Sequence, residues 1–364
     1  MKILLVCGIY RPDIGGPATY IPTLAEHLLN ISHQVEVVTL KNESSKIESE
    51  PWLVNRISRN QFFILRFIKT FLMLSRRSRK VDMVFANGLF EETAFALLFS
   101  KKRSVAKVVG DDVWHRALNR GATRLSLVEF NNSKLNISYK IQRSLLTWSL
   151  NRFDEITCPS KQLEQIIINW GVRSPITVIP NGVPNIECKN KTKVFDLVSV
   201  SRLIKLKNID RVIRVASECD ASLVIVGNGP EENNLKIYAK SINANVTFMG
   251  TLNNSEVRNV LCQSKIFMLL SDHEGMSFAL LEAMAAGLAP VVSNVTGNTA
   301  VVSNTFNGLV VDHTNHEATV EAVTNLLNSP LFLKEMSESA MIKINNEYSQ
   351  ESQIKKMVKL ILAP

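Results

Sequence analysis

The sequence predicts a two-domain α/β protein of the doubly wound class, in which parallel strands alternate with helices. Three observations support this class. Short apolar runs rich in β-branched residues alternate with segments of helical periodicity. The alternation stops at a polar, turn-rich stretch near residue 184 and then restarts. A chain of 364 residues is also long enough for two cores of ordinary domain size.

In the first half, the helical segments lie near Pro17–Asn30 and Phe62–Ser78. The expected strands are Lys2–Gly8, Gln34–Leu40, Val81–Asn87, Ser104–Gly110, Glu155–Pro159 and Ile176–Pro180. Strands that are separated by helices pair in parallel, and ligands of such sheets bind at the carboxyl ends of the strands. Residues 1–183 therefore form the first expected domain.

The stretch Pro180–Pro184 and the charged run Glu187–Lys193 contain turn residues without periodicity, which marks a domain boundary. Residues 184–347 form the second expected domain. Its strands are Phe195–Ser201, Ser222–Gly227, Asn245–Met249, Ile266–Leu270 and Ala289–Ser293. Helical periodicity continues near Pro330–Asn346 and Ser349–Leu362, and the last helix, within 348–364, could pack back on the first domain.

Composition describes a globular protein, with 46% hydrophobic and 21% charged residues. The five cysteines are scattered without a C-x-x-C pair, so neither a metal cluster nor a disulfide framework is expected, and a reducing cytosol fits best. The apolar run Lys2–Gly8 is too short for a signal peptide. It is expected to be a buried first strand.

The net charge of +9 is unevenly distributed. Residues 1–183 carry 25 Lys and Arg against 15 Asp and Glu, whereas residues 184–364 carry 17 against 18. Nucleic acid, anionic lipid or a phosphorylated substrate could each explain a basic half. Between Arg56 and Lys80 there are eight basic residues and no acid, interleaved with apolar residues over a length too short to span a bilayer. This helix either lies in the headgroup layer or packs one face on the sheet with solvated basic ends.

The segment from Ser271 to Gly287 is the most informative motif. It places Glu274 on a loop and Glu282 inside a helix that is expected to begin near Ser277. Gly275 lets backbone approach a ligand, and the start of the helix offers unpaired N–H groups to phosphate. Carboxylates beside such a helix start suit a sugar nucleotide. The alternative is a packed helix whose acids are incidental.

Two further turns follow expected strands of the second half. Arg202 and Lys207 follow one strand, where two cations could stabilise a diphosphate leaving group, although both could instead form surface salt bridges. Gly227 and Gly229 follow the next strand, where they either make a tight turn or contact a ligand.

Together these motifs resemble the retaining GT-B glycosyltransferases of family 4. The Glu274/Glu282 pair is similar to the E-x7-E element of that family, and the Arg202/Lys207 and Gly227/Gly229 turns match two more of its motifs. The diglycine Gly15-Gly16 and the stretch Pro180–Val183 match its N-terminal loop and interdomain element. The resemblance covers essentially the whole chain. It implies two facing Rossmann-like domains with a cleft between them.

The resemblance also implies roles for individual residues. Glu282 would bind the ribose hydroxyls and Glu274 would lie beside the donor sugar, next to Gly275, Met276 and Ser277. The backbone at Thr251 and Leu252 would border the base, and the donor site would include Gly227 and Gly229. Gly15 and Gly16 would close over phosphate or acceptor.

One departure from the family concerns a histidine that many relatives carry after the strand Ser104–Gly110. Here Asp111 takes its place, and a subgroup of bacterial members shares this pattern. Asp111, Trp114 and His115 would then face the acceptor or the donor sugar, although His115 could also be a solvent-facing helix residue. The sequence has no D-x-D triplet and no histidine spacing for a metal. Neither a metal nor a cofactor beyond the nucleotide sugar is expected.

The function that follows is a retaining, metal-independent transfer of a hexose from a nucleotide diphosphate sugar to a glycan acceptor. The acceptor is expected to be a lipid-linked oligosaccharide of bacterial surface polysaccharide synthesis, such as lipopolysaccharide or capsule. The expected location is cytoplasmic, with peripheral attachment to the inner face of the cell membrane and no nucleic-acid partner. A sugar-nucleotide 2-epimerase of the same fold and a non-catalytic binding subunit are the alternatives.

Overall fold

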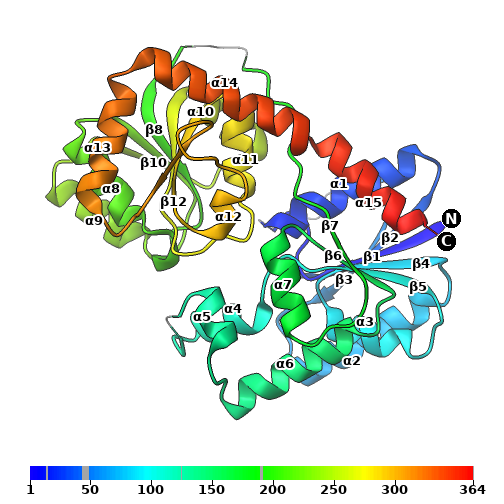
Figure 1. Ribbon diagram of the computed structural model, residues 1–364. Coiled ribbons are helices and arrows are strands. Elements are labelled where there is room, and N and C mark those ends of the chain that lie inside the picture. Colours follow the sequence, from blue (N-terminus) through cyan, green and yellow to red (C-terminus); the bar gives the residue numbers. More distant parts are fainter. Residues whose placement is uncertain (14, 43–48, 124, 189–191, 364) are drawn as a thin grey trace. The chain divides into compact units, whose positions relative to one another are not determined.

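The computed structural model describes residues 1–364 apart from 14, 43–48, 124, 189–191 and 364. The chain divides into two compact units. The first comprises Met1–Ile179 together with the residues from Ile354 onward, and the second comprises Pro180–Gln353. Each unit is a parallel sheet with helices on both faces, as the alternating sequence pattern predicts (Figure 1).

The first unit contains a seven-stranded sheet in the order β3-β2-β1-β4-β5-β6-β7. Its strands are β1 (Lys2–Cys7), β2 (Gln34–Lys41), β3 (Leu53–Ser58), β4 (Met83–Asn87), β5 (Arg103–Lys107), β6 (Glu155–Cys158) and β7 (Ile176–Val178). The order reverses between β1 and β4, whose register pairs Ile3 with Met83. Five of the six residues of β1 are buried, as expected for a central strand with both faces covered.

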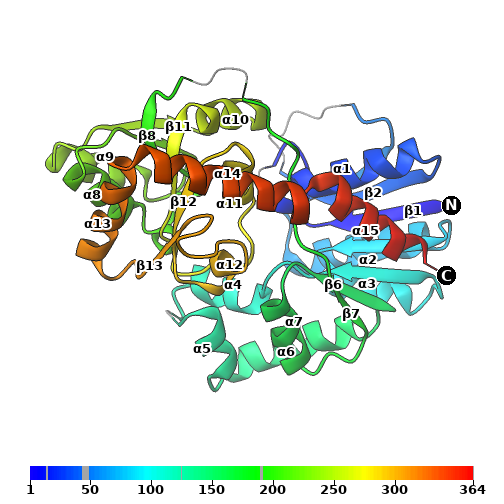
Figure 2. The ribbon, with the colours of Figure 1, turned by 45° about the horizontal axis from the view of Figure 1, so that its top comes forward.

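Helices cover both faces of this sheet. They are α1 (Gly16–Asn30), α2 (Phe63–Ser78), α3 (Phe90–Leu97), α4 (Asp112–Asn119), α5 (Leu127–Asn132), α6 (Ile137–Leu150), α7 (Lys161–Asn169) and α15 (Gln350–Leu362). Helices α1 and α15 lie on one face, and α2 and α3 lie on the other (Figure 2). Met357 and Ile361 of α15 are fully buried in one core with Ile3 and Leu24, and Arg103 donates to the Leu360 carbonyl at 3.2 Å. The end of the chain is therefore part of the first unit.

The second unit contains a six-stranded sheet in the order β10-β9-β8-β11-β12-β13. Its strands are β8 (Phe195–Val200), β9 (Leu223–Val226), β10 (Val246–Gly250), β11 (Ser264–Leu269), β12 (Ala289–Ser293) and β13 (Leu309–Val311). Its helices are α8 (Ile209–Glu218), α9 (Glu232–Ser241), α10 (Asn254–Cys262), α11 (Phe278–Ala285), α12 (Thr296–Thr299), α13 (His316–Leu327) and α14 (Pro330–Glu347), with a 3-10 turn at Lys205–Lys207.

The faces of this sheet bury alternate residues of each strand. Leu197 packs with α8, α9 and α13, whereas its neighbour Val198 packs with α10, α11 and α14. This alternation follows from the period of two in a strand. It produces two apolar layers that hold the loops at the carboxyl ends of the strands.

Two features of the structure differ from the sequence-based expectations, and part of one expected segment falls on residues that the structure does not describe. The expected series of strands lacks β3 and β13. β3 is a partly exposed edge strand with Asn55 and Arg56 in its middle, so it gives no clear apolar pattern. β13 is an apolar edge strand, but it has only three residues. The structure also joins Cys188 and Cys262 in a disulfide, although none was expected, because a separation of 74 residues carries no recognisable spacing. Residues 189–191 of the expected linker lie outside the described residues.

None of the described helices is long and apolar enough to cross a membrane.

Candidate active site

The candidate site lies in the second unit, where the order of its strands reverses. β8 and β11 are neighbours, but β8 continues to β9 on one side and β11 continues to β12 on the other. Two loops that leave adjacent strands at such a point diverge and open a crevice at the carboxyl ends. The loop after β8 carries Arg202 and Lys207, and the loop after β11 carries Glu274.

Lys207 and Glu274 meet in an ion pair. The Lys207 Nζ lies 2.5 Å from Glu274 Oε1, and the two side chains are 18% and 9% exposed. Glu274 is thus a largely buried carboxylate that is stabilised by a charge-assisted hydrogen bond. The pair leaves two N–H groups of Lys207 and the second carboxylate oxygen of Glu274 for other partners.

A second link fixes the two loops against each other. Asn208 adopts a left-handed backbone conformation with φ of 48°, and its side chain donates to the Leu270 carbonyl at 2.9 Å and to Asp272 Oδ1 at 2.6 Å. The Asp272 N–H donates to the Leu206 carbonyl at 3.0 Å. These bonds hold Lys207 and Glu274 in register, and sequence reasoning missed them although Asn208 directly follows the recognised lysine.

Asp272 also contacts His313, whose Nε2 lies 2.9 Å from Asp272 Oδ1. Burial raises the pKa of this carboxyl, but hydrogen bonds from His313 and Asn208 outweigh burial and bring the pKa below its usual value. Asp272 is therefore an ionised anchor of the loop. A residue 41 positions away in sequence gives no local signal for such a contact.

The loop continues into α11, the helix that the sequence expects near Ser277. Ser277 is its N-cap and accepts a hydrogen bond from the Leu280 N–H at 3.3 Å. Met276 is buried, and both its sulfur and its carbonyl lie 3.3 Å from Asn181 nitrogens. Met276 and Ser277 thus shape the loop through their own contacts.

Gly297 of α12 explains how close the backbone comes to this loop. A Cβ at Gly297 would lie 2.1 Å from the Glu274 carbonyl oxygen, so only glycine fits there. The backbone of Glu274 and Gly275 therefore packs directly against the start of α12. The sequence did not single out Gly297.

Glu282 lies one turn into α11 and is half-buried. Desolvation by burial raises its pKa, and the nearby Arg258 of α10 partly opposes this shift. The Arg258 Nε is itself buried without a hydrogen-bond partner. A carboxylate and a guanidinium that both have few hydrogen-bond partners can bind the polar groups of a ligand. The sequence analysis had predicted only Glu282 for this site.

Gly227 and Gly229 have a clear packing reason. A Cβ at Gly227, where φ is 129°, would lie 1.9 Å from the Ser201 carbonyl oxygen, and one at Gly229 would lie 2.3 Å from the Leu203 carbonyl oxygen. The Leu203 N–H donates to the Asn228 carbonyl at 2.8 Å. The two glycines therefore allow the loops after β8 and β9 to touch. This contact accounts for them without a ligand.

The remaining expected donor residues lie at the ends of neighbouring strands. The Gly227 N–H donates to the Gly250 carbonyl at 2.7 Å, which brings the start of the Thr251–Leu252 segment beside the glycine turn. Thr251 is exposed and Leu252 packs against the core. Arg202 is exposed, and its side chain pairs with no acid among the described residues.

In the first unit, the diglycine precedes α1. Gly15 has a φ of 157° and is the N-cap residue, and Gly16 begins the helix. The loops after β1 and β4, where this sheet reverses, approach each other closely, because a Cβ at Gly88 would lie 3.3 Å from the Gly8 nitrogen. Gly88, which the sequence did not single out, thus belongs to the same edge of the sheet.

Asp111 occupies a different setting from the one expected. It is fully buried, caps α4 by accepting from the Val113 and Trp114 N–H groups, and pairs with Arg143 at 2.5 Å. Trp114 is also fully buried, and its Nε1 donates to the Leu125 carbonyl at 2.9 Å. The expectation that Asp111 and Trp114 face a sugar stays a prediction, and their burial weighs against direct contact. His115 is exposed beside Gly110.

No group of three or more His, Cys, Asp or Glu side chains in the described part of the chain could hold a metal ion.

Comparisons with known proteins agree with this architecture. Residues 14–185 match the family model described as Glycosyltransferase Family 4, and residues 186–343 match the one described as Glycosyl transferases group 1. The alpha-monoglucosyldiacylglycerol synthase of Acholeplasma laidlawii is 23% identical over 96% of this chain and 94% of its own length. A UDP-Gal:alpha-D-GlcNAc-diphosphoundecaprenol alpha-1,3-galactosyltransferase of Escherichia coli is 31% identical over 39% of this chain and 37% of its own length.

Solved structures show the same fold. HepE of Anabaena, in complex with UDP and glucose, superposes with a TM-score of 0.81 at 14% identity over 100% of both chains. A sucrose-phosphate synthase of Thermosynechococcus elongatus superposes with a TM-score of 0.80 at 17% identity over 99% of this chain and 98% of its own. The epimerase alternative gains no support from these relatives. The chain belongs to the family 4, group 1 glycosyltransferases, and its fold is GT-B.

Proposed function

We propose that this glycosyltransferase moves a hexose from a nucleotide diphosphate sugar to a glycan or lipid-linked acceptor, with retention of configuration at the transferred carbon. The observation that carries the proposal is the Lys207–Glu274 pair at the strand reversal of the second unit. A cation and a carboxylate held 2.5 Å apart can each take a different part of one activated sugar. Lys207 is suited to the diphosphate and Glu274 to the sugar hydroxyls.

The charge that develops during transfer is negative and grows on the leaving diphosphate. Lys207 keeps two N–H groups for phosphate oxygens, and the exposed Arg202 lies on the same loop. Cations that lie beside the leaving group as the bond breaks stabilise the charge of the transition state more than that of the ground state. We therefore propose that these residues, together with the N-terminus of α11, balance the leaving group without a metal ion.

Glu282 and Arg258 complete the proposed donor site. The partly buried Glu282 carboxylate can accept hydrogen bonds from two adjacent ribose hydroxyls. These bonds would replace the hydration that the carboxylate loses on burial. Two relatives favour a lipid-linked acceptor, because one is a galactosyltransferase for a diphosphoundecaprenol-linked sugar and the other is a glucosyldiacylglycerol synthase. Synthesis of a bacterial surface polysaccharide, such as lipopolysaccharide or capsule, is the setting that we propose.

We also propose peripheral contact of the first unit with the inner face of the cell membrane. Residues 1–183 carry ten more basic than acidic residues. Helix α2 exposes Phe62, Phe63 and Ile64 at its start and exposes basic residues at its end. Exposed apolar and cationic side chains on one helix suit a headgroup layer of anionic lipid.

The test is a product assay with UDP- and GDP-hexoses and a short lipid-linked acceptor. The wild-type protein should release the nucleoside diphosphate only with acceptor, give an α-linked product from an α-linked donor by NMR, and keep its activity in EDTA. Glu274→Gln should lower kcat at least about 100-fold, the magnitude typical of removing a positioned electrostatic group. Glu335→Gln, an exposed change on α14, is the matched control.

An inverted product would exclude retention, and loss of activity in EDTA that Mg²⁺ restores would exclude metal independence. A Glu274→Gln enzyme as active as Glu335→Gln would remove the Lys207–Glu274 pair from the mechanism.

A further inference from the structure

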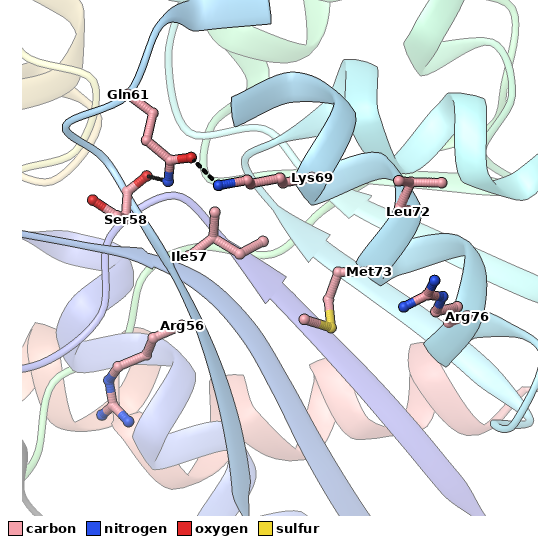
Figure 3. Close-up of a pocket in the computed structure, with 8 residues that line it drawn as sticks. All are labelled: Arg56, Ile57, Ser58, Gln61, Lys69, Leu72, Met73 and Arg76. Atoms are coloured by element: carbon pink, nitrogen blue, oxygen red, sulfur yellow. Dashed lines mark hydrogen bonds between the residues drawn. The ribbon is translucent and has the colours of Figure 1, made fainter. Parts of the chain in front are cut away.

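A cavity of about 370 Å³ lies in the first unit between the end of β3 and helix α2. Its walls are apolar where Ile57 of β3 faces Leu72 and Met73 of α2, and polar where Gln61, Lys69 and Arg76 line it (Figure 3). The Arg56 guanidinium turns away from these α2 side chains and lies 5.5 Å from the Tyr10 ring. Among the described residues, none of those that line the cavity is acidic.

The polar end of this cavity holds donors that are already oriented. The Gln61 side chain donates to the Ser58 carbonyl at 2.9 Å, and its oxygen accepts from Lys69 Nζ at 2.7 Å. This leaves Lys69 two further N–H groups. The Ser58 hydroxyl is buried and has no hydrogen-bond partner among the described residues. Arg76 forms no ion pair with a described residue. Two cations and an unused hydroxyl, in a cavity whose described lining contains no acid, suit an anion with several oxygens.

The apolar part indicates which anion. Leu65, Ile68 and Leu72 are exposed on the same side of α2 as Lys69 and Arg76, and Phe62 at the start of the helix is 90% exposed. A small phosphate in water would need only the cations. An anion with attached hydrocarbon would use the cations, the apolar wall and the exposed helix face together.

We propose that this cavity binds the phosphate group of one anionic membrane lipid, with the lipid chains lying along the exposed apolar side of α2. The proposal deepens the proposed membrane contact and rests on it, whereas it does not depend on which sugar is transferred. It makes that contact a defined site that recognises one headgroup, in addition to the general attraction between a basic protein and an anionic surface.

The experiment compares two double variants of the full-length protein that remove the same charge from the same helix region. Lys69→Gln/Arg76→Gln changes the cavity, and Arg79→Gln/Lys80→Gln changes exposed cations just beyond it. Binding to vesicles of phosphatidylcholine with phosphatidylglycerol is measured by flotation, and melting temperatures verify that both variants fold. The cavity variant should lose at least about tenfold more affinity than the control variant, because it also loses charge-assisted hydrogen bonds. Equal losses would mean general electrostatics and overturn the proposal.

A soluble probe separates the lipid from a free anion. Dihexanoyl phosphatidylglycerol below its micelle concentration should bind the wild-type protein at one saturable site by calorimetry, and the Lys69→Gln/Arg76→Gln protein should lose this binding. Inorganic phosphate should bind at least about tenfold more weakly, because it lacks the apolar contacts. Phosphate binding as tightly as the lipid would overturn the proposal. The product assay, which uses neither vesicles nor this lipid, tests the transferase function separately.

Discussion

At the scale of single residues, the candidate site combines groups that favour the folded state with groups that oppose it. Lys207 and Glu274 neutralise each other at 2.5 Å, and Asp272 is held ionised by His313 and Asn208. Glu282 differs, because burial raises its pKa and Arg258 only partly compensates. A carboxylate that the fold leaves short of partners is a common feature of ligand sites.

Glu282→Gln should therefore raise stability while it weakens donor binding. A carboxyl whose pKa is raised in the folded state lowers stability as pH rises from its ordinary pKa to the raised value, because the unfolded chain loses its proton first. The melting temperature of Glu282→Gln should thus exceed that of the wild-type protein at pH 8, and the difference should vanish near pH 4. Calorimetry at both pH values and titration with the preferred nucleotide sugar check the two effects. A variant that is less stable at pH 8 would show that Glu282 is already well paired.

The site residues also show what could and could not be predicted from the sequence. The apolar pattern of the sequence was enough to predict that Glu274 and Lys207 lie just after strands, because each follows an apolar run. It could not reveal that Asp111 is fully buried under Asn131 and Arg143, since those partners lie 20 and 32 positions away. Burial of a polar residue depends on tertiary partners that local pattern does not contain.

At the scale of elements, the sequence predicted the strands that are buried on both faces, whereas of the edge strands it predicted β7 and β10 but missed β3 and β13. β1 and β4 are central in their sheet and consist mainly of apolar residues. β3 is an edge strand whose middle residues are polar, so its sequence resembles a loop. The sequence left open whether helix α2 packs on the sheet or lies in a headgroup layer. Both a packed face and an exposed apolar face are rich in Phe and Leu, so the composition of the helix does not distinguish them.

The Cys188–Cys262 disulfide should contribute measurable stability to the second unit. It links the segment before β8 to the end of α10 across 74 residues. Cross-linking a loop of that length removes unfolded-state entropy worth about 4–5 kcal/mol in the chain-entropy model. Reduction, or a Cys262→Ser change, should lower the unfolding transition by several degrees or more, as measured by calorimetry with and without dithiothreitol.

Cys219→Ser is the control for this measurement, because Cys219 is outside the bond. A transition that dithiothreitol leaves unchanged would mean that the two thiols stay unlinked in solution, as a reducing compartment favours.

At the scale of the whole molecule, charge and chemistry are divided between the two halves of the sequence. The basic excess lies entirely in residues 1–183, whereas the Lys207–Glu274 pair and Glu282 lie in a half with a net charge of −1. Such a division lets one half attract an anionic surface at long range without changing the local electrostatics of the donor site.

Binding to anionic vesicles should consequently depend strongly on salt. The Debye length falls from about 10 Å at 0.1 M to about 3 Å at 1 M, which screens the long-range attraction. We expect flotation with phosphatidylglycerol vesicles to weaken at least about tenfold over this range. Vesicles of phosphatidylcholine alone serve as the control. Salt-independent binding would show that insertion of the apolar residues of α2 dominates instead.

The discontinuous first unit has a consequence for synthesis on the ribosome. Helix α15 supplies residues such as Met357 and Ile361 to a core whose other members lie between Ile3 and Ile179. Translation at about 5–20 residues per second makes that core wait roughly 10–35 s, while the intervening second unit is made, before its last helix emerges. During this interval, the apolar side chains that α15 will cover remain open to chaperones, so the nascent chain should depend on them more than the finished enzyme does.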